Sequence, residues 1–283
     1  MYKVLNKERL APGIFLMDVA APLVARKAEP GQFIILRVYD MGERIPLTIA
    51  DYDREKGTVT IVFQVVGKTT KLLSELDEGD CILDFAGPMG KPSEFDGLRR
   101  VLAVGGGVGV APLYPQVRKM HDMGIDVDVI IGAKSKDYLI LVDKMRPYCT
   151  NLYIATDDGS EGFHGFVSDV LKKLVEEDGE RYDRVIAIGP LIMMKVVSEM
   201  TKRYDLPTIV SMNPIMMDGT GMCGACRVKV GDVTLHACVD GPDFDGHLVD
   251  FDEAMRRQSF YKDEERLAMQ MLEQEEGGQC QCH

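Results

Sequence analysis

Three cysteines and one aspartate in the last third of the chain are spaced like the ligands of a metal cluster. Four residues separate Asp218 from Cys223, two separate Cys223 from Cys226, and eleven separate Cys226 from Cys238. This is the plant-type [2Fe–2S] spacing with an aspartate in place of the first cysteine. We therefore expect Asp218, Cys223, Cys226 and Cys238 to ligate a [2Fe–2S] cluster.

Small residues fill the intervals between these four positions. Gly219, Gly221, Gly224 and Ala225 would let backbone N–H groups approach the inorganic sulfides with no bulky Cβ in the way. On the residues alone, two other interpretations stay open: a structural zinc site made by the three cysteines with His236, and cysteines that bind no metal. The aspartate is also suited to cap the loop without ligating.

The other cysteines give a weaker signal. Cys280, Cys282 and His283 form a Cys-x-Cys-His run that can bind metal, but beside a glycine-rich terminus we expect it to fray. The first residues lack the apolar core of a signal peptide, and a Cys-x-x-Cys pair is present. We therefore expect a cytoplasmic protein whose cysteines are metal ligands or free thiols rather than disulfides.

A glycine-rich turn at residues 105–109 follows a buried apolar run and precedes a helical pattern. One such turn is a weak signal, but two more polar or glycine-rich segments, 155–160 and 189–194, also follow predicted strands. Because the carboxyl ends of parallel strands meet at one edge of a sheet, we expect the three segments to form a nucleotide site. The candidate contacts are Gly105, Gly106, Gly107, Gly109, Asp157, Asp158, Gly189 and Met193.

Two polar stretches interrupt the strand-like pattern of the first hundred residues. Arg44 and Thr48 flank Pro46 and Leu47, an arrangement suited to clamp a diphosphate and to offer backbone to a flat ring. Residues 67–70, Gly-Lys-Thr-Thr, stand where a strand meets a helix, and the first N–H groups of a helix form an anion site. Taken singly, the first stretch is explained by an ordinary surface arginine, and the second by an ordinary turn that caps a helix.

The surrounding pattern predicts a β barrel plus α/β fold with two appended segments. Residues 1–97 contain short alternating strands, typical of an antiparallel barrel. Residues 98–206 alternate strands with helices, which predicts a doubly wound parallel sheet. In a small cluster module, residues 207–250, a Gly-Asp hairpin returns Cys238 to the Cys-x-x-Cys pair. Residues 251–283 form an acidic helical tail with a narrow apolar face, which favours docking on another chain.

Composition restricts the possible partners. The chain has 283 residues, 46% of them hydrophobic, and a formal net charge of −12. Such an acidic surface argues against nucleic acid and anionic membranes as partners. No apolar run reaches the length of about 18 residues that a transmembrane helix needs.

Together, the two barrel motifs resemble those of the ferredoxin–NADP reductase superfamily. The matching residues are Arg44, Pro46, Leu47 and Thr48 for the R-x-[YFL]-[ST] motif, with one more residue before Leu47 than the motif has, and Gly67, Thr69 and Thr70 for the G-x-x-T phosphate turn. The resemblance implies FAD, with Arg44 on the diphosphate and Thr48 near the isoalloxazine ring. Leu47 replaces the common aromatic residue, as in the branch of the dihydroorotate dehydrogenase electron-transfer subunits.

The same branch is similar to this chain in its glycine turn and in the segments T-D-D-G-S and G-P-x-x-M, which bind pyridine nucleotide there. The resemblance places residues 105–109 at the pyrophosphate, Gly189 and Met193 beside the nicotinamide, and Asp157 and Asp158 at the edge of the site. An acidic residue and no arginine pair follow the second strand of this domain. This favours NAD(H) over NADP(H).

Two groups of relatives share the order of FAD domain, NAD domain and cluster module. The dihydroorotate dehydrogenase subunits normally supply four cysteines, whereas the small subunits of NADH-dependent ferredoxin:NADP oxidoreductases have an aspartate as first ligand, like Asp218. The second resemblance implies a larger flavin and [4Fe–4S] partner subunit, which reaches ferredoxin and NADP in electron-bifurcating transhydrogenation. Because the cofactors carry the chemistry, we predict no catalytic side chain. The alternatives are a subunit for dihydroorotate oxidation and a non-enzymatic zinc- and nucleotide-binding module.

Overall fold

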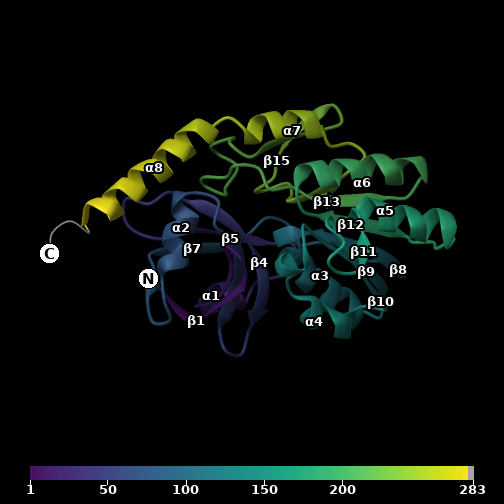
Figure 1. The fold of residues 1–283 in the computed structure, drawn as a ribbon, viewed down its shortest axis with the longest axis horizontal. Coiled ribbons are helices and arrows are strands. Elements are labelled where there is room, and N and C mark those ends of the chain that lie inside the picture. Colours follow the sequence, from purple (N-terminus) through teal and green to yellow (C-terminus); the bar gives the residue numbers. More distant parts are fainter. Residues whose placement is uncertain (280–283) are drawn as a thin grey trace.

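The structure is a computed structural model that describes residues 1–279. Figure 1 shows an antiparallel barrel at the N-terminal end, a parallel sheet with helices on both faces, and a C-terminal arm that runs over both. This architecture confirms the predicted β barrel plus α/β fold. The Cys-x-Cys-His run at residues 280–283 lies outside the described residues.

Seven strands of the N-terminal part form one sheet in the order β6-β1-β2-β5-β4-β3-β7, with antiparallel neighbours. The outer strands β6 and β7 are consecutive in the chain, so the sheet curls into a nearly closed barrel. Alternate residues such as Ile34, Leu36, Ile61 and Phe63 are buried in one apolar cluster, because successive strand side chains face opposite sides. The elements are β1 (Tyr2–Ala11), β2 (Ile14–Ala20), α1 (Pro22–Ala25), β3 (Phe33–Arg37), β4 (Ile45–Asp53), β5 (Thr58–Gln64), α2 (Lys68–Glu75), β6 (Cys81–Ile82) and β7 (Asp84–Met89).

Seven further strands form the second sheet in the order β11-β10-β9-β8-β12-β13-β16, all parallel except β16. From β8 the chain moves outward to β9, β10 and β11, and then returns to β12 on the other side of β8. This reversal between β8 and β12 is the place where doubly wound sheets bind ligands. The strands are β8 (Arg100–Gly106), β9 (Asp126–Ala133), β10 (Asn151–Thr156), β11 (Phe163–His164), β12 (Arg184–Ile188), β13 (Thr208–Ser211) and β16 (Asp243–Asp245).

Helices cover both faces of the parallel sheet. In Figure 1, α3 and α4 lie on the face toward the bottom of the view, and α5 and α6 lie on the opposite face. Their bounds are α3 (Val110–Asp122), α4 (Val142–Met145), α5 (Val167–Lys172), a π-helical turn (Lys173–Glu177) and α6 (Leu191–Arg203), with short 3-10 turns at Gly107–Gly109, Lys136–Tyr138 and Arg146–Tyr148.

The segment after α6 contributes to the large sheet and also forms a small unit of its own. It supplies β13 and β16 to the parallel sheet, and between them β14 (Arg227–Val230) and β15 (Val233–His236) form the predicted hairpin. Cys226 and Cys238 are buried in the same apolar cluster as Val210 of β13 and Val197 of α6. The cluster loop is therefore anchored on the parallel sheet.

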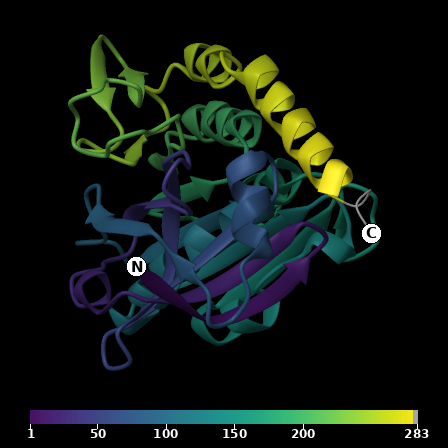
Figure 2. The same cartoon turned by 90° about the vertical axis from the view of Figure 1, so that its left-hand side faces the viewer.

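Two helices end the described chain, α7 (Phe251–Gln258) and α8 (Lys262–Gln279). Helix α7 contacts α6, and α8 runs from there across the molecule to contact α2 of the barrel (Figure 2). Leu272 of α8 is buried, whereas Leu267 and Met271 are each about half exposed. The docking of this tail on another chain stays a prediction.

Candidate electron-transfer site

Three glycines and one methionine close the carboxyl ends of β8 and β12. A Cβ atom on Gly106 would lie 2.4 Å from the sulfur of Met193, and one on Gly189 would lie 2.8 Å from its Cε. A Cβ atom on Gly109 would lie 2.3 Å from the carbonyl oxygen of the residue before Gly189. At Gly109 only hydrogen fits beside the backbone, whereas at Gly106 and Gly189 a Cβ atom would displace the Met193 side chain, so both strand ends come together at the switch point of the sheet.

The other two glycines of the turn have different surroundings. A Cβ atom on Gly105 would lie 3.0 Å from the side chain of Val110, because α3 packs closely over the end of β8. Gly107 has φ +55°, and a Cβ atom there would meet nothing within 4 Å. Gly107 therefore lies on the open side of the turn, where its backbone is accessible to a ligand.

Asp157 and Asp158 follow β10 at the same edge of the sheet, two strands away from the glycine turn. The N–H of Asp158 donates to the carbonyl of Lys134, 3.3 Å away, which joins the loops after β9 and β10. The hydroxyl and N–H of Ser160 both donate to the Asp158 carboxylate, and these hydrogen bonds lower its pKa. The structure thus brings the three predicted nucleotide segments to one edge of the sheet.

The first flavin motif lies at the start of β4. Arg44 immediately precedes the strand, and over Pro46, Leu47 and Thr48 the strand pairs with β3. Pairing with β5 begins only at Ile49. Over this stretch β4 is hydrogen-bonded to a neighbouring strand, β3, on one side only, and such an edge position tolerates proline. The backbone groups on its other side do not pair with β5, so they are suited to face a ligand.

The second flavin motif lies next to the first. The hydroxyl of Thr70 accepts from the N–H of Gly67 and donates to its carbonyl, at 3.0 and 2.9 Å, and so caps α2. The hydroxyl of Thr69 donates to the carboxylate of Glu43, 3.0 Å away. Since Glu43 is the residue before Arg44, this bond brings the two motifs together in space.

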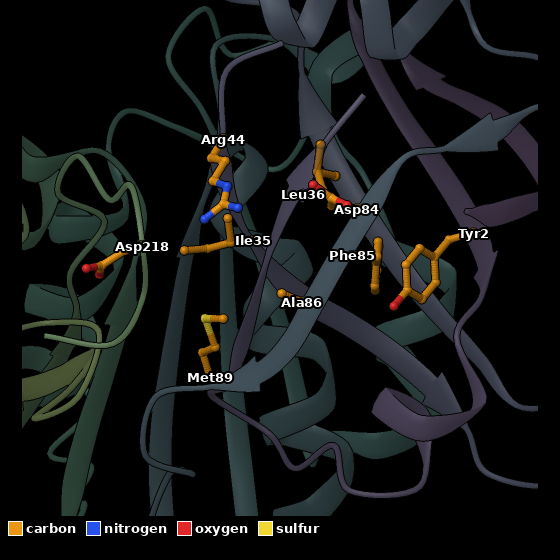
Figure 3. A pocket seen from close by; sticks show the side chains of 9 residues that line it. All are labelled: Tyr2, Ile35, Leu36, Arg44, Asp84, Phe85, Ala86, Met89 and Asp218. Carbon is orange, nitrogen blue, oxygen red and sulfur yellow. The ribbon is translucent and has the colours of Figure 1, made fainter. Parts of the chain in front are cut away.

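A cavity of about 270 Å³ lies between the barrel and the cluster loop (Figure 3). Arg44, Met89 and Asp218 line it from three separate segments of the chain. Ligand pockets usually measure about 300–1,000 Å³, so this cavity suits one part of a large ligand. Its remaining walls are Tyr2, Ile35, Leu36, Asp84, Phe85 and Ala86.

The four predicted cluster ligands lie in two adjacent pairs. The sulfur atoms of Cys226 and Cys238 are 3.2 Å apart. The carboxylate of Asp218 accepts from the N–H of Cys223 at 3.1 Å and from that of Thr220 at 2.9 Å. Because a [2Fe–2S] cluster has four protein ligands on two irons, a pair for each iron is the arrangement it needs.

The donor geometry also bears on the zinc interpretation. A structural zinc ion needs four donors around one centre. Among residues 1–279, no three His, Cys, Asp or Glu side chains converge as ligands of a single ion. A two-iron cluster takes two protein ligands on each iron, and the two contacting pairs agree with that arrangement.

The two pairs differ in their electrostatics. Burial raises the pKa of the Cys238 thiol to about 12, and its contact with Cys226 adds to the shift. The hydrogen bond from the N–H of Thr220 lowers the pKa of Asp218, which is ionised at neutral pH. Since thiols must lose their protons to ligate, loading the buried pair with metal releases protons.

Several residues of the cavity carry no signal in the sequence. Ile35 and Met89 line the same cavity because β3 and β7 pair antiparallel, with Phe33 opposite Met89 and Ile35 opposite Ala86. Each residue alone is an ordinary core side chain. Only the strand order places them against the cluster loop.

Comparisons with known proteins find an iron–sulfur domain in this chain and relatives over nearly its whole length. Residues 213–250 match the iron–sulfur cluster binding domain of dihydroorotate dehydrogenase B. The chain is 45% identical to a dihydroorotate dehydrogenase B (NAD(+)) electron transfer subunit homolog of Thermotoga maritima, over 94% of this chain and 93% of the relative. It is 57% identical to an uncharacterised protein of Clostridium beijerinckii, over 100% of this chain and 99% of the relative.

A solved structure extends the comparison. One chain of an NADH-dependent reduced ferredoxin–NADP oxidoreductase, studied for flavin-based electron bifurcation, superposes with a TM-score of 0.91. The two sequences are 43% identical, and the match covers 96% of this chain and 98% of that one.

Fold, site and similarity define an oxidoreductase subunit with an iron–sulfur domain. The chain belongs to the family of the dihydroorotate dehydrogenase B electron-transfer subunits and their homologues. Members of this family are subunits of larger complexes, which implies a partner subunit. Among the described residues, no helix has the length and apolar character needed to cross a membrane.

Proposed function

We propose that this chain carries FAD, NAD(H) and a [2Fe–2S] cluster and passes electrons between NADH and a larger partner subunit. The complex would be an electron-bifurcating NADH-dependent ferredoxin:NADP transhydrogenase. The observation that carries the proposal is the pair formed by Asp218 and Cys223 at the first two ligand positions. Similarity over nearly the whole chain to an NADH-dependent reduced ferredoxin–NADP oxidoreductase supports it.

The parallel sheet supplies the nucleotide site in this proposal. The glycine turn has backbone N–H groups at a helix start, which suits a pyrophosphate. Met193 packs on the two glycines at the strand ends and forms the wall for the nicotinamide. The proposed contacts are Gly105, Gly106, Gly107, Gly109, Gly189 and Met193, with Asp157 and Asp158 at the edge.

The barrel supplies the flavin site and the C-terminal loop supplies the cluster ligands. Arg44 faces the cavity as the cation for a diphosphate, and the backbone of residues 46–48 faces the ring. When bound, FAD takes up the two electrons and the hydrogen nucleus that NADH gives as hydride, and releases the electrons singly to the cluster. The other proposed contacts are Gly67, Thr69 and Thr70, and the ligands are Asp218, Cys223, Cys226 and Cys238.

The proposed partner is a larger subunit with flavin and [4Fe–4S] centres, through which ferredoxin and NADP are reached. The exposed apolar residues Leu267 and Met271 of α8 suit docking on that subunit. The proposed domains are the barrel, residues 1–97, the nucleotide domain, residues 98–206, and the cluster module, residues 207–250, followed by the tail. The proposed location of the protein is the cytoplasm.

Serving dihydroorotate oxidation is the second candidate function. It is favoured by the relatives named as electron transfer subunits of dihydroorotate dehydrogenase B, such as that of Fusobacterium nucleatum, 33% identical over 83% of this chain and 92% of the relative. The aspartate in the first ligand position argues against it, since the subunits that serve dihydroorotate oxidation normally supply four cysteines.

Spectroscopy of the purified full chain tests the cofactor proposal. We expect one FAD and two irons per chain, a [2Fe–2S] EPR signal after reduction, and bleaching of the flavin absorbance by NADH. A colourless protein that contains zinc would overturn the proposal. The partner proposal is tested by co-expression with each candidate large subunit. NADP reduction that needs both NADH and reduced ferredoxin supports transhydrogenation, whereas NAD-dependent dihydroorotate oxidation supports the second candidate.

A further inference from the structure

One ion pair joins the barrel to the parallel-sheet domain between the two proposed cofactor sites. Arg118 lies on α3, and its Nη2 atom is 2.7 Å from Oδ1 of Asp51 on β4. Helix α3 lies beside β4 in Figure 1, and the two elements are in contact. The pair therefore spans the boundary between the two folded parts.

Both partners of this pair are held in place. The N–H of Tyr52 donates to the same carboxylate oxygen of Asp51 at 2.7 Å. The guanidinium of Arg118 lies 5.8 Å from the ring centre of Tyr52 and 5.6 Å from that of Tyr114. Burial alone would lower the pKa of Arg118, but the Asp51 carboxylate and the Tyr114 side chain together outweigh it and the pKa is raised. A charged, stacked arginine with a fixed partner has few alternative positions.

The boundary around this pair is apolar, and hydrogen bonds cross elsewhere, from Arg184 to the carbonyl of Glu94 at 2.8 Å and from Ser93 to Asp243 at 2.5 Å. Ala50 and Val62 of the barrel share one buried cluster with Val110 and Leu113 of α3. Apolar contact is favourable but non-directional, so it resists separation of the two parts more than it resists sliding. A hydrogen-bonded ion pair has a preferred geometry and so fixes how the two surfaces are aligned.

Each partner is rigidly connected to one proposed site. Asp51 is three residues beyond Thr48 on the same strand, about 10 Å at the usual rise per residue. Arg118 is nine residues beyond Gly109 on a continuous helix, about 14 Å at the usual rise. A shift at the ion pair is therefore transmitted to the distance between the ring site and the nicotinamide site.

We infer that Asp51 and Arg118 are positioning residues that align the nucleotide site with the flavin site for hydride transfer. The inference rests on the proposed function and deepens it. Reacting atoms must approach to about 3–3.5 Å, and a misplacement of about 1 Å can cost 100-fold in rate. Neither residue gains or loses a proton or an electron in the step, in which one hydrogen nucleus and two electrons leave NADH together.

The test measures flavin reduction in the holoprotein. Asp51→Asn and Arg118→Gln should slow the single-turnover bleaching by NADH about 10-fold or more, at unchanged FAD content and unchanged NADH affinity. The deuterium isotope effect with 4-deuterated NADH should persist or grow, because the hydride step itself is slowed. The double variant should be no slower than the slower single variant, since both changes break one contact. The rate for Arg118→Lys should fall between those of the wild type and Arg118→Gln. This variant serves as the test where Arg118→Gln fails to fold.

Lys7→Gln is the matched control. Lys7 also combines an ion pair, 3.0 Å to Asp77, with an aromatic contact, 5.7 Å to the Phe15 ring centre, but all three residues belong to the barrel. It should leave the reduction rate unchanged. Hydrogen exchange, which does not depend on turnover, should show faster exchange in β4 and α3 for Arg118→Gln and Asp51→Asn but not for Lys7→Gln.

Two results would overturn the inference, and they are distinguishable. Reduction at the wild-type rate in both single variants, even with a lower melting temperature, would show a merely structural pair. A wild-type protein that holds no FAD, or whose FAD is not reduced by NADH, would overturn the proposed function and this inference together.

Discussion

Gly219 of the cluster loop lies directly against Met89 of barrel strand β7. A Cβ atom on Gly219 would stand 2.2 Å from the Met89 sulfur and 2.8 Å from Cδ1 of Ile35. The backbone at Gly219 has φ +77°, a conformation that side chains disfavour. The loop therefore reaches the cavity wall because the residue after Asp218 has no side chain.

This contact makes Gly219→Ala a test of how the loop is held. The variant should lose both the left-handed conformation and the close contact with Met89, so we expect less iron per chain and a weaker [2Fe–2S] EPR signal. Gly231→Ala is the matched control, because Gly231 also has positive φ, +58°, but a Cβ atom there meets nothing within 4 Å. Equal iron loss in the two variants would show that backbone strain alone matters.

Asp218→Cys tests the proposed first ligand. If the carboxylate ligates iron, a thiolate in its place should change the EPR g values and lower the reduction potential, because sulfur donates more electron density than oxygen. If Asp218 only accepts the two backbone N–H bonds of the loop, the iron keeps its ligands. An unchanged spectrum and potential with full iron content would then contradict the ligand assignment.

The sequence predicts the local features well, since they depend on neighbours in the chain. The glycine turn, the Gly-Asp hairpin and the ligand spacing each appear within a few residues. It does not predict the first strand, β1, nor that Pro46 lies in a strand, because a proline in a short polar stretch resembles a turn. Long-range pairs such as Arg118 with Asp51 depend on how two domains pack, and neither residue has a local signature.

The switch point of the parallel sheet gives a comparison between two glycines. Gly109→Ala would place its Cβ 2.3 Å from a backbone carbonyl, which cannot move without separating β12 from the turn. Gly106→Ala meets the flexible Met193 sulfur instead, which can turn aside. We expect Gly109→Ala to abolish measurable NADH binding and Gly106→Ala to weaken it roughly tenfold, about 1.4 kcal/mol. Calorimetric titration of the holoprotein with NADH measures both.

A reversed order of the two affinities would contradict this packing argument. Gly124→Ala is the control, because Gly124 follows α3 on the far side from the turn and a Cβ atom there meets nothing within 4 Å. It should reduce stability slightly, through its positive φ, without changing NADH affinity.

A buried polar network stabilises the amino ends of the parallel strands. Asp128 of β9 is 1% exposed and accepts hydrogen bonds from Arg100 at 3.0 Å, Tyr182 at 2.8 Å and Asn151 at 2.7 Å. A buried carboxylate with three donors is satisfied, whereas one that loses a donor carries an added desolvation cost. The network joins β8, β9, β10 and the segment before β12.

Tyr182→Phe tests this network through pH. Burial raises the pKa of Tyr182 far above its ordinary value of 10.0, and the hydrogen bond to Asp128 adds to the shift. Above pH 10 the unfolded chain releases this proton while the folded chain keeps it, so stability should fall by up to about 1.4 kcal/mol per pH unit. Urea unfolding at pH 7, 9, 10 and 11 should show a shallower fall for Tyr182→Phe, together with a loss of about 1 kcal/mol at pH 7. Tyr261→Phe is the control, because Tyr261 is exposed and its removal should leave the pH dependence of stability unchanged. Parallel curves of stability against pH for wild type and Tyr182→Phe would contradict the buried-tyrosine explanation.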